Sequence, residues 1–108
     1  MTNKPNNLLI NVVTLNDSVT IHLGKRFTFL DQSDFEDAYK TLLNKQQIKQ
    51  VIVDLVNLEY IDSTALGTLL VLREKTQAIN ASLVLTNPKI VVLKALNAVH
   101  FERLFSIQ

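Results

Sequence analysis

The six-residue segment from Val51 to Val56 constrains the fold most, because five of its residues are aliphatic and only Asp54 is polar. A short, nearly unbroken apolar run is typical of a strand that is covered on both faces and lies in the middle of a sheet. Strands of this kind belong to sheets with helical crossovers. The segment therefore predicts an α/β fold with this strand at its centre.

Two further apolar runs precede this strand, over residues 8–15 and 19–23, and Asn16 and Asp17 stand between them. In the second run apolar and polar residues alternate, which predicts a strand with one buried face. Asn and Asp tolerate the left-handed backbone conformation that primed two-residue turns require. We therefore expect the sheet to begin with an antiparallel hairpin.

Helix-start signals occur at two places outside the central region. Ser33 and Glu36 have the spacing of a capping box, and apolar residues recur at helical spacing over residues 33–45. Asn87 before a proline is typical of an N-cap followed by proline at the first helical position, which predicts a helix over residues 88–97.

Short strands over residues 82–86 and 104–107 complete a mixed β-sheet packed by α-helices, with right-handed crossovers between parallel strands. With 108 residues the chain is long enough for one domain with one hydrophobic core. We assign residues 1–7, which are polar and contain Pro5, to an N-terminal tail, and residues 8–108 to a single α/β domain.

The composition narrows the classes of function. The net charge is +1 without a block of like charges, so we expect no nucleic-acid partner and no binding to anionic membrane. No apolar stretch approaches the length of a membrane span, and the start lacks the pattern of a secretory signal. The absence of cysteine fits a reducing compartment. We therefore expect a cytoplasmic protein that does not insert into a membrane.

Groups suited to catalysis are scarce. The only histidines, the residue type best suited to acid–base catalysis near neutral pH, are His22 and His100, and each is better explained as an ordinary surface or half-buried histidine. The chain has no HExxH metal motif, no GxSxG nucleophile motif and, with two glycines, no glycine-rich phosphate loop. The sequence therefore predicts a protein that is not an enzyme and that has no cofactor and no metal.

Asp54 has two explanations. Its place at the end of an apolar strand is similar to that of the phosphoacceptor in response-regulator receivers, where a carboxylate binds magnesium together with an acidic pair. The acidic pair is missing, and the chain opens with a hairpin where a receiver has a strand and a helix. A structural role, with Asp54 hydrogen-bonded to the loop before Ser63, is the better explanation.

The sequence DSTALG at residues 62–67 opens a predicted helix over residues 63–78 whose first half is apolar almost all round. The free amide groups and the positive dipole end of a helix start favour a nearby anion, so a phosphoserine would be tolerated there. Asp and Ser are also ordinary helix caps, and the spacing alone does not distinguish a cap from a modification site.

The stretch VIVDLVNLEYIDSTALGTLLVL, residues 51–72, resembles the centre of STAS domains, the family of anti-sigma factor antagonists, or anti-anti-sigma factors. The family motif is an apolar strand, a short loop and Asp-Ser-Ser/Thr-Gly-Leu/Val-Gly at a helix start. The resemblance extends over residues 8–107, through the hairpin, the helix near 33–45 and the final segment HFERLFSI. It implies a STAS-type mixed sheet.

The resemblance also implies a bacterial partner-switching regulator of transcription. In the family, a partner kinase phosphorylates the serine after the aspartate, which is Ser63 here; Thr64 is a weaker candidate. The unphosphorylated form binds a cognate anti-sigma factor that is a serine-protein kinase, and a serine phosphatase acts in the same cycle. The expected partner-binding surface comprises Asp62, Ser63, Thr64 and Thr28. Alternatively, STAS domains serve as non-switching structural subunits of membrane-associated complexes, for example in lipid transport.

Three departures from the family pattern stand out. Ala65 replaces a glycine, which adds one methyl group and lowers the entropy cost of the helix. Thr28 occupies a place where many relatives have an aspartate beside the phosphosite. The chain ends at Gln108, where many relatives continue into another helix that packs against the sheet, so we expect an uncovered apolar patch that would support a homodimer or a partner interface.

Overall fold

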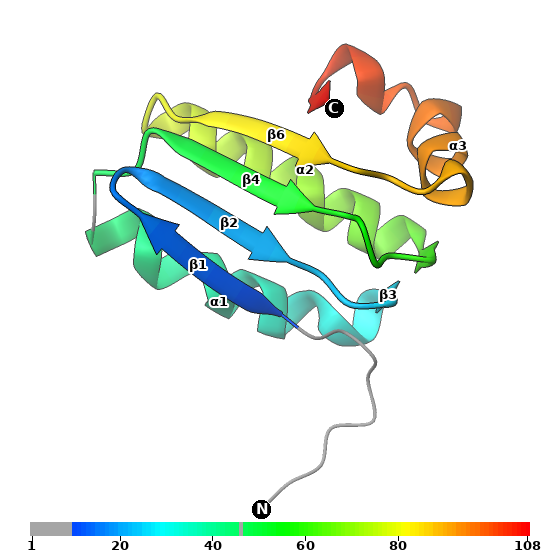
Figure 1. Cartoon of the computed structure of the whole chain (residues 1–108), viewed down its shortest axis with the longest axis horizontal. Helices are drawn as coiled ribbons and strands as arrows, with labels where there is room; N and C mark the ends of the chain where they lie inside the picture. Colours follow the sequence, from blue (N-terminus) through cyan, green and yellow to red (C-terminus); the bar gives the residue numbers. More distant parts are fainter. Residues whose placement is uncertain (1–9, 46) are drawn as a thin grey trace, which may run out of the picture.

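Five strands form one mixed sheet in the computed structural model, which describes residues 10–45 and 47–108 (Figure 1). The strands are β1 (Asn11–Leu15), β2 (Ser18–His22), β4 (Gln50–Asp54), β6 (Ser82–Thr86) and β7 (Ser106–Ile107). They lie in the order β1-β2-β4-β6-β7. The β1–β2 pair is antiparallel and the other neighbours are parallel. The predicted α/β class and the opening hairpin are confirmed.

Two of the three helices lie on one side of this sheet (Figure 1). The helices are α1 (Gln32–Lys45), α2 (Ser63–Ala78) and α3 (Ile90–Ala98), with short 3-10 turns η1 (Phe29–Asp31) and η2 (Phe101–Arg103). In Figure 1, α1 and α2 lie behind the sheet and α3 lies beyond the end of β6. From β2 to β7 every crossover moves in the same direction across the sheet, and right-handed crossovers of this kind put their helices on one face.

The hydrophobic core lies between the sheet and the helices α1 and α2. Alternate side chains of the two central strands point toward these helices and are buried: Val19 and Ile21 in β2, and Val51 and Val53 in β4. Leu69 of α2 is also fully buried. The core therefore uses one face of each strand, in agreement with the alternation predicted for β2.

The prediction that β4 is covered on both faces is wrong, although its central position is confirmed. No helix among the described residues covers the second face of the sheet, and Ile52 on that face is only half-buried. β4 also ends at Asp54, and Val56 is 46% exposed in the loop that follows. The apolar run therefore predicted a central strand correctly but predicted helices on both faces incorrectly. Because all crossovers run in one direction, their helices leave the second face of the sheet open.

Two helix starts differ from the prediction. The capping box forms at Thr28 and Asp31, ahead of η1, and Ser33 is the second residue of α1. α3 begins at Ile90, because Asn87 adopts a left-handed conformation with φ of 58° and so cannot cap a helix that starts at the next residue.

The first and last strands are also shorter than predicted. β1 begins at Asn11, and residues 1–7 and the first two residues predicted for this strand lie outside the described residues. The last strand contains only Ser106 and Ile107 of the predicted 104–107. The turn between β1 and β2 is as predicted, with Asn16 at φ of 56°.

Candidate functional site

A second, two-stranded parallel sheet carries the start of α2. Its strands are β3 (Arg26–Phe27) and β5 (Tyr60–Ile61). The amide of Asp62 continues this pairing by donating to the carbonyl of Phe27 at 3.2 Å. The sequence did not predict these strands, because two residues are too few for alternation to show. They fix the backbone immediately before α2.

Asp62 joins two elements that are far apart in the sequence. It has an extended backbone, and its Oδ1 accepts a hydrogen bond from the amide of Ala65 at 2.8 Å, so it is the N-cap of α2. Its Oδ2 accepts from the amide of Phe29 in η1 at 2.9 Å. One carboxylate therefore satisfies a free amide at the start of α2 and holds η1 beside it.

The turn η1 presents two large apolar side chains to solvent. Phe29 is 63% exposed and Leu30 is 60% exposed. Thr28 accepts from the amide of Leu30 at 3.3 Å, and Asp31 accepts from the amide of Thr28 at 2.9 Å. Thr28 itself is buried, so it reaches the expected partner-binding surface through the turn that it caps. Phe29 and Leu30 were not predicted from the sequence, although the spacing of Thr28 and Asp31 is that of a capping box.

Ser63 and Thr64 are the first two residues of α2, and both are exposed. Their neighbour Ala65 is fully buried and belongs to the hydrophobic core. The methyl group that distinguishes Ala65 from the family's glycine therefore packs inward, away from the exposed hydroxyl groups. The arrangement presents a hydroxyl at a helix N-terminus, where a phosphoryl group would meet free amides and the positive dipole end.

His22, Asp54 and Asn87 form a second polar cluster at the carboxyl ends of β2, β4 and β6. Asp54 Oδ2 lies 2.9 Å from His22 Nδ1, and Asp54 Oδ1 accepts from Asn87 Nδ2 at 3.3 Å and from the amide of Val56 at 3.1 Å. Burial opposes ionisation of Asp54, but these hydrogen bonds together with the charge of His22 lower its pKa. The predicted structural role of Asp54 agrees with these contacts, and its bond to the chain that follows is to Val56, directly after β4.

Neither histidine belongs to a group that resembles a metal centre. His100 lies in the turn after α3, with φ of 61° and with Nδ1 at 3.6 Å from Glu102. Over residues 10–45 and 47–108, no three His, Cys, Asp or Glu side chains are arranged so that they could hold a metal ion. In the same ranges no helix is both long and apolar enough to cross a bilayer.

Comparison with known proteins gives the family of this chain. The model of the STAS domain family matches residues 10–108. A STAS-domain containing protein of Pseudomonas aeruginosa is 40% identical over 89 residues, which cover 82% of this chain and 86% of that protein. The chain belongs to the STAS domain family.

Solved structures of anti-sigma factor antagonists share the fold. A putative antagonist from Thermotoga maritima superposes with a TM-score of 0.81 at 20% identity, covering 91% of this chain and 84% of that one. The antagonist SpoIIAA in its unphosphorylated form gives a TM-score of 0.78 at 18% identity over 94% of this chain and 87% of that one. The phosphorylated form of SpoIIAA, from Bacillus, gives 0.71 at 17% identity over 94% of this chain and 90% of that one. The predicted STAS-type fold is confirmed, and it is similar to that of SpoIIAA.

Proposed function

We propose that this STAS domain is an anti-sigma factor antagonist that switches partners through reversible phosphorylation of Ser63. The observation that carries the proposal is the exposed Ser63 hydroxyl on the first residue of α2, beside the apolar turn η1 that Asp62 holds in place. A kinase needs access to the hydroxyl, and a protein partner needs apolar surface near it. Ser63, Phe29 and Leu30 meet both needs.

The unphosphorylated form binds a cognate anti-sigma factor that is also a serine-protein kinase. Its binding surface comprises Asp62, Ser63 and Thr64 at the start of α2, together with the turn capped by Thr28. Tyr60, two residues before Asp62, is a further half-exposed aromatic side chain, and the guanidinium of Arg26 lies 5.0 Å from the centre of its ring. A serine phosphatase returns the protein to the binding form. This cycle is a regulatory, non-catalytic role in the cytoplasm, with transcription as its output.

Phosphorylation acts by charge at one small spot. A phosphoserine carries about 1.5 to 2 negative charges near pH 7, which would move the formal net charge from +1 to about −1. The N-terminus of α2 partly compensates this charge inside the domain. A partner surface has no such compensation, so like charges and desolvation oppose binding there. The modification therefore changes partner affinity and leaves the fold in place.

Affinity capture from extract of the native cells tests the proposal with matched baits. Wild type and Ser63→Ala should retain a kinase-type partner, whereas Ser63→Asp should lose at least about tenfold in affinity, a change of roughly 1.4 kcal/mol. Ser33→Asp is the control, because Ser33 is an exposed serine in the first turn of α1 and the substitution adds the same charge. An identical partner set on all four baits would contradict the switch and favour a non-switching structural subunit.

Thermal melting separates an interface effect from an unfolding effect. Ser63→Asp should melt close to wild type, because an aspartate in the first turn of a helix is favourable. A loss of about 1 kcal/mol would lower the melting temperature by roughly 4–8 °C in a domain of this size. A drop larger than that would mean that the substitution damages the fold, and the binding loss would then not support the switch.

A further inference from the structure

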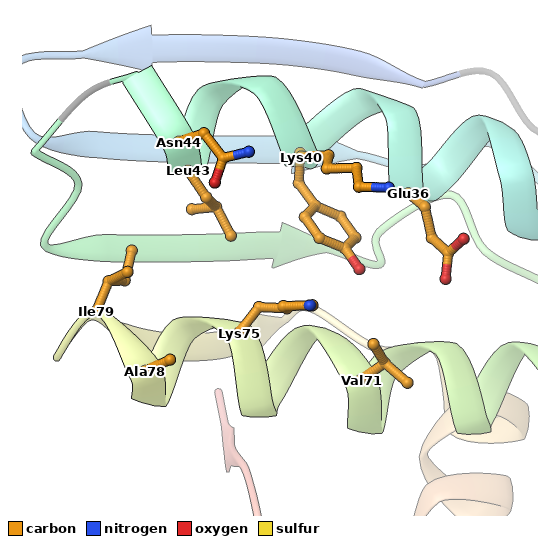
Figure 2. Close-up of a pocket in the computed structure, with 9 residues that line it drawn as sticks. Glu36, Lys40, Leu43, Asn44, Val71, Lys75, Ala78 and Ile79 are labelled. Carbon is orange, nitrogen blue, oxygen red and sulfur yellow. The ribbon is translucent and has the colours of Figure 1, made fainter.

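A hollow of about 390 Å³ lies between α1 and α2 in the outer surface of the helix layer (Figure 2). Five of the residues that line it are apolar or aromatic: Tyr39, Leu43, Val71, Ala78 and Ile79. Sites for small molecules commonly enclose roughly 300–1,000 Å³ and have mainly apolar walls. The site is separate from the phosphosite, because Lys75 in its wall follows Ser63 by about 18 Å along α2.

Two lysines line this hollow from opposite walls. Lys40 belongs to α1 and Lys75 to α2 (Figure 2), and neither forms an ion pair with another described residue. Glu36 lies at one end, one helical turn before Lys40; burial and the charge of Glu36 both raise the pKa of Tyr39. An anion is therefore favoured between the lysines and disfavoured toward Glu36.

The apolar part of the hollow extends away from Glu36. Leu43 and Ile79 line it at the far end, and the same two residues line a second hollow of about 540 Å³. The other residues that line the second hollow are Gln47, Ile48, Lys49 and Asn80. Ile79 is 38% exposed although it is aliphatic. The two hollows adjoin at Leu43 and Ile79 and form one groove, in which this apolar stretch lies directly beside the pair Lys40 and Lys75 and the outer end is polar.

We propose that this groove binds a single-chain anionic amphiphile, a fatty carboxylate, with the carboxylate between Lys40 and Lys75 and the acyl chain along Leu43 and Ile79. The charge pattern matches a ligand with one anionic end and one apolar end. One turn of a partner α-helix, about 10–12 Å across and about 5.4 Å long, occupies a larger volume than this hollow of about 390 Å³, so a helix does not fit inside it. A single acyl chain is narrow enough to lie within it.

Titration with monomeric decanoate, followed by amide chemical shifts in NMR, tests the proposal on the whole chain. Saturable shifts should concentrate at α1 and α2 around the groove. Lys75→Glu should weaken binding at least about tenfold, whereas Lys94→Glu, an equal charge change on an exposed lysine of α3, should keep it within about twofold. Ile79→Ser, at an exposed position, should also weaken binding without unfolding the domain.

Several results would overturn the proposal. One is the absence of saturable shifts at any monomeric decanoate concentration, and another is equal binding by wild type and Lys75→Glu. Equal affinity for uncharged decanol would show that the lysines select nothing. Binding of an acidic amphipathic peptide at the groove, without binding of decanoate, would show that the site serves a protein partner.

Discussion

Asp54 is the last residue of the central strand β4 and Ser63 comes nine positions later, yet their surroundings differ. The Asp54 carboxylate is occupied by bonds from three partners: the His22 ring, the Asn87 amide group and the Val56 amide. The Ser63 side chain is exposed on the first turn of α2, and its neighbour Asp62 makes the structural bonds at that position. At Asp54 the polar atoms are hydrogen-bonded to one another. At Ser63 the hydroxyl is exposed, and the hydrogen bonds of Asp62 to Ala65 and Phe29, which we call the Asp62 frame, fix the backbone beside it.

This difference teaches how a modification site can be separated from a structural one. At Asp54 the polar atoms connect the ends of β2 and β4 with Asn87, the residue after β6, so a change there costs stability. At the start of α2, Asp62 makes the structural hydrogen bonds, because it caps the helix and binds η1. The hydroxyl of Ser63 is not needed for these bonds and remains accessible to a kinase. We therefore expect substitutions of Asp62 and Asp54 to lower the stability of the domain and substitutions of Ser63 to leave it unchanged.

The largest effect on stability is expected from Asp62→Ala. The substitution removes the cap of α2 and the bond to Phe29, so we expect a loss of about 2 kcal/mol in the free energy of unfolding. Chemical denaturation measures it. Asp62→Asn, which keeps an acceptor oxygen, should recover at least half of the loss. Equal stability of wild type and Asp62→Ala would contradict the structural role of Asp62.

Ala65→Gly should have the next largest effect. It deletes a fully buried methyl group and places glycine inside a helix, which together cost about 1.5 kcal/mol. The domain should remain folded, since the family motif carries glycine at this position. Denaturation of both variants under the same conditions provides the measurement, and a stabilised Ala65→Gly variant would contradict the packing described here.

Asp54→Asn should reduce stability at pH 7 by about 0.5–1 kcal/mol, because the cluster loses its charge-assisted bonds at a partly exposed site. The fold lowers the pKa of Asp54, so its contribution is present above about pH 4 and is lost as the pH falls through the lowered pKa. Wild type should therefore lose more stability than Asp54→Asn in this acid range. Parallel stability curves for the two proteins would show that the cluster contributes nothing.

The smallest effects are expected at the free hydroxyl groups. Ser63→Ala and Thr64→Ala should each change the free energy of unfolding by less than about 0.5 kcal/mol, as exposed surface substitutions usually do. Calorimetry detects a change of that size through the melting temperature. A larger loss for Ser63→Ala would mean that its hydroxyl supports the fold, which would remove the contrast with Asp54.

The sequence predicted those parts of the fold that depend on periodicity and local caps. The alternation of apolar and polar residues predicted β2, and the turn at Asn16 predicted the hairpin. The DSTALG segment predicted that α2 starts at Ser63. It did not predict which face of β4 is covered, because crossover direction is a property of the whole chain.

The parts of the site that escaped the sequence are those made by contacts across the chain. The hydrogen bond that the amide of Phe29 donates to Asp62 joins residues that are 33 positions apart, so no local sequence pattern predicts it. The exposure of Phe29 and Leu30 also depends on that contact. The groove between α1 and α2 follows from the packing of two helices, which hydrophobic spacing alone does not specify.

Site-resolved mass spectrometry of the protein isolated from its native cells tests the central claim most directly. The account predicts one phosphoryl group on Ser63 in a fraction of the molecules, and its loss from a Ser63→Ala strain without transfer to Thr64. Ser63 that stays unmodified under every growth condition, or a phosphoryl group on Thr64 alone, would contradict it.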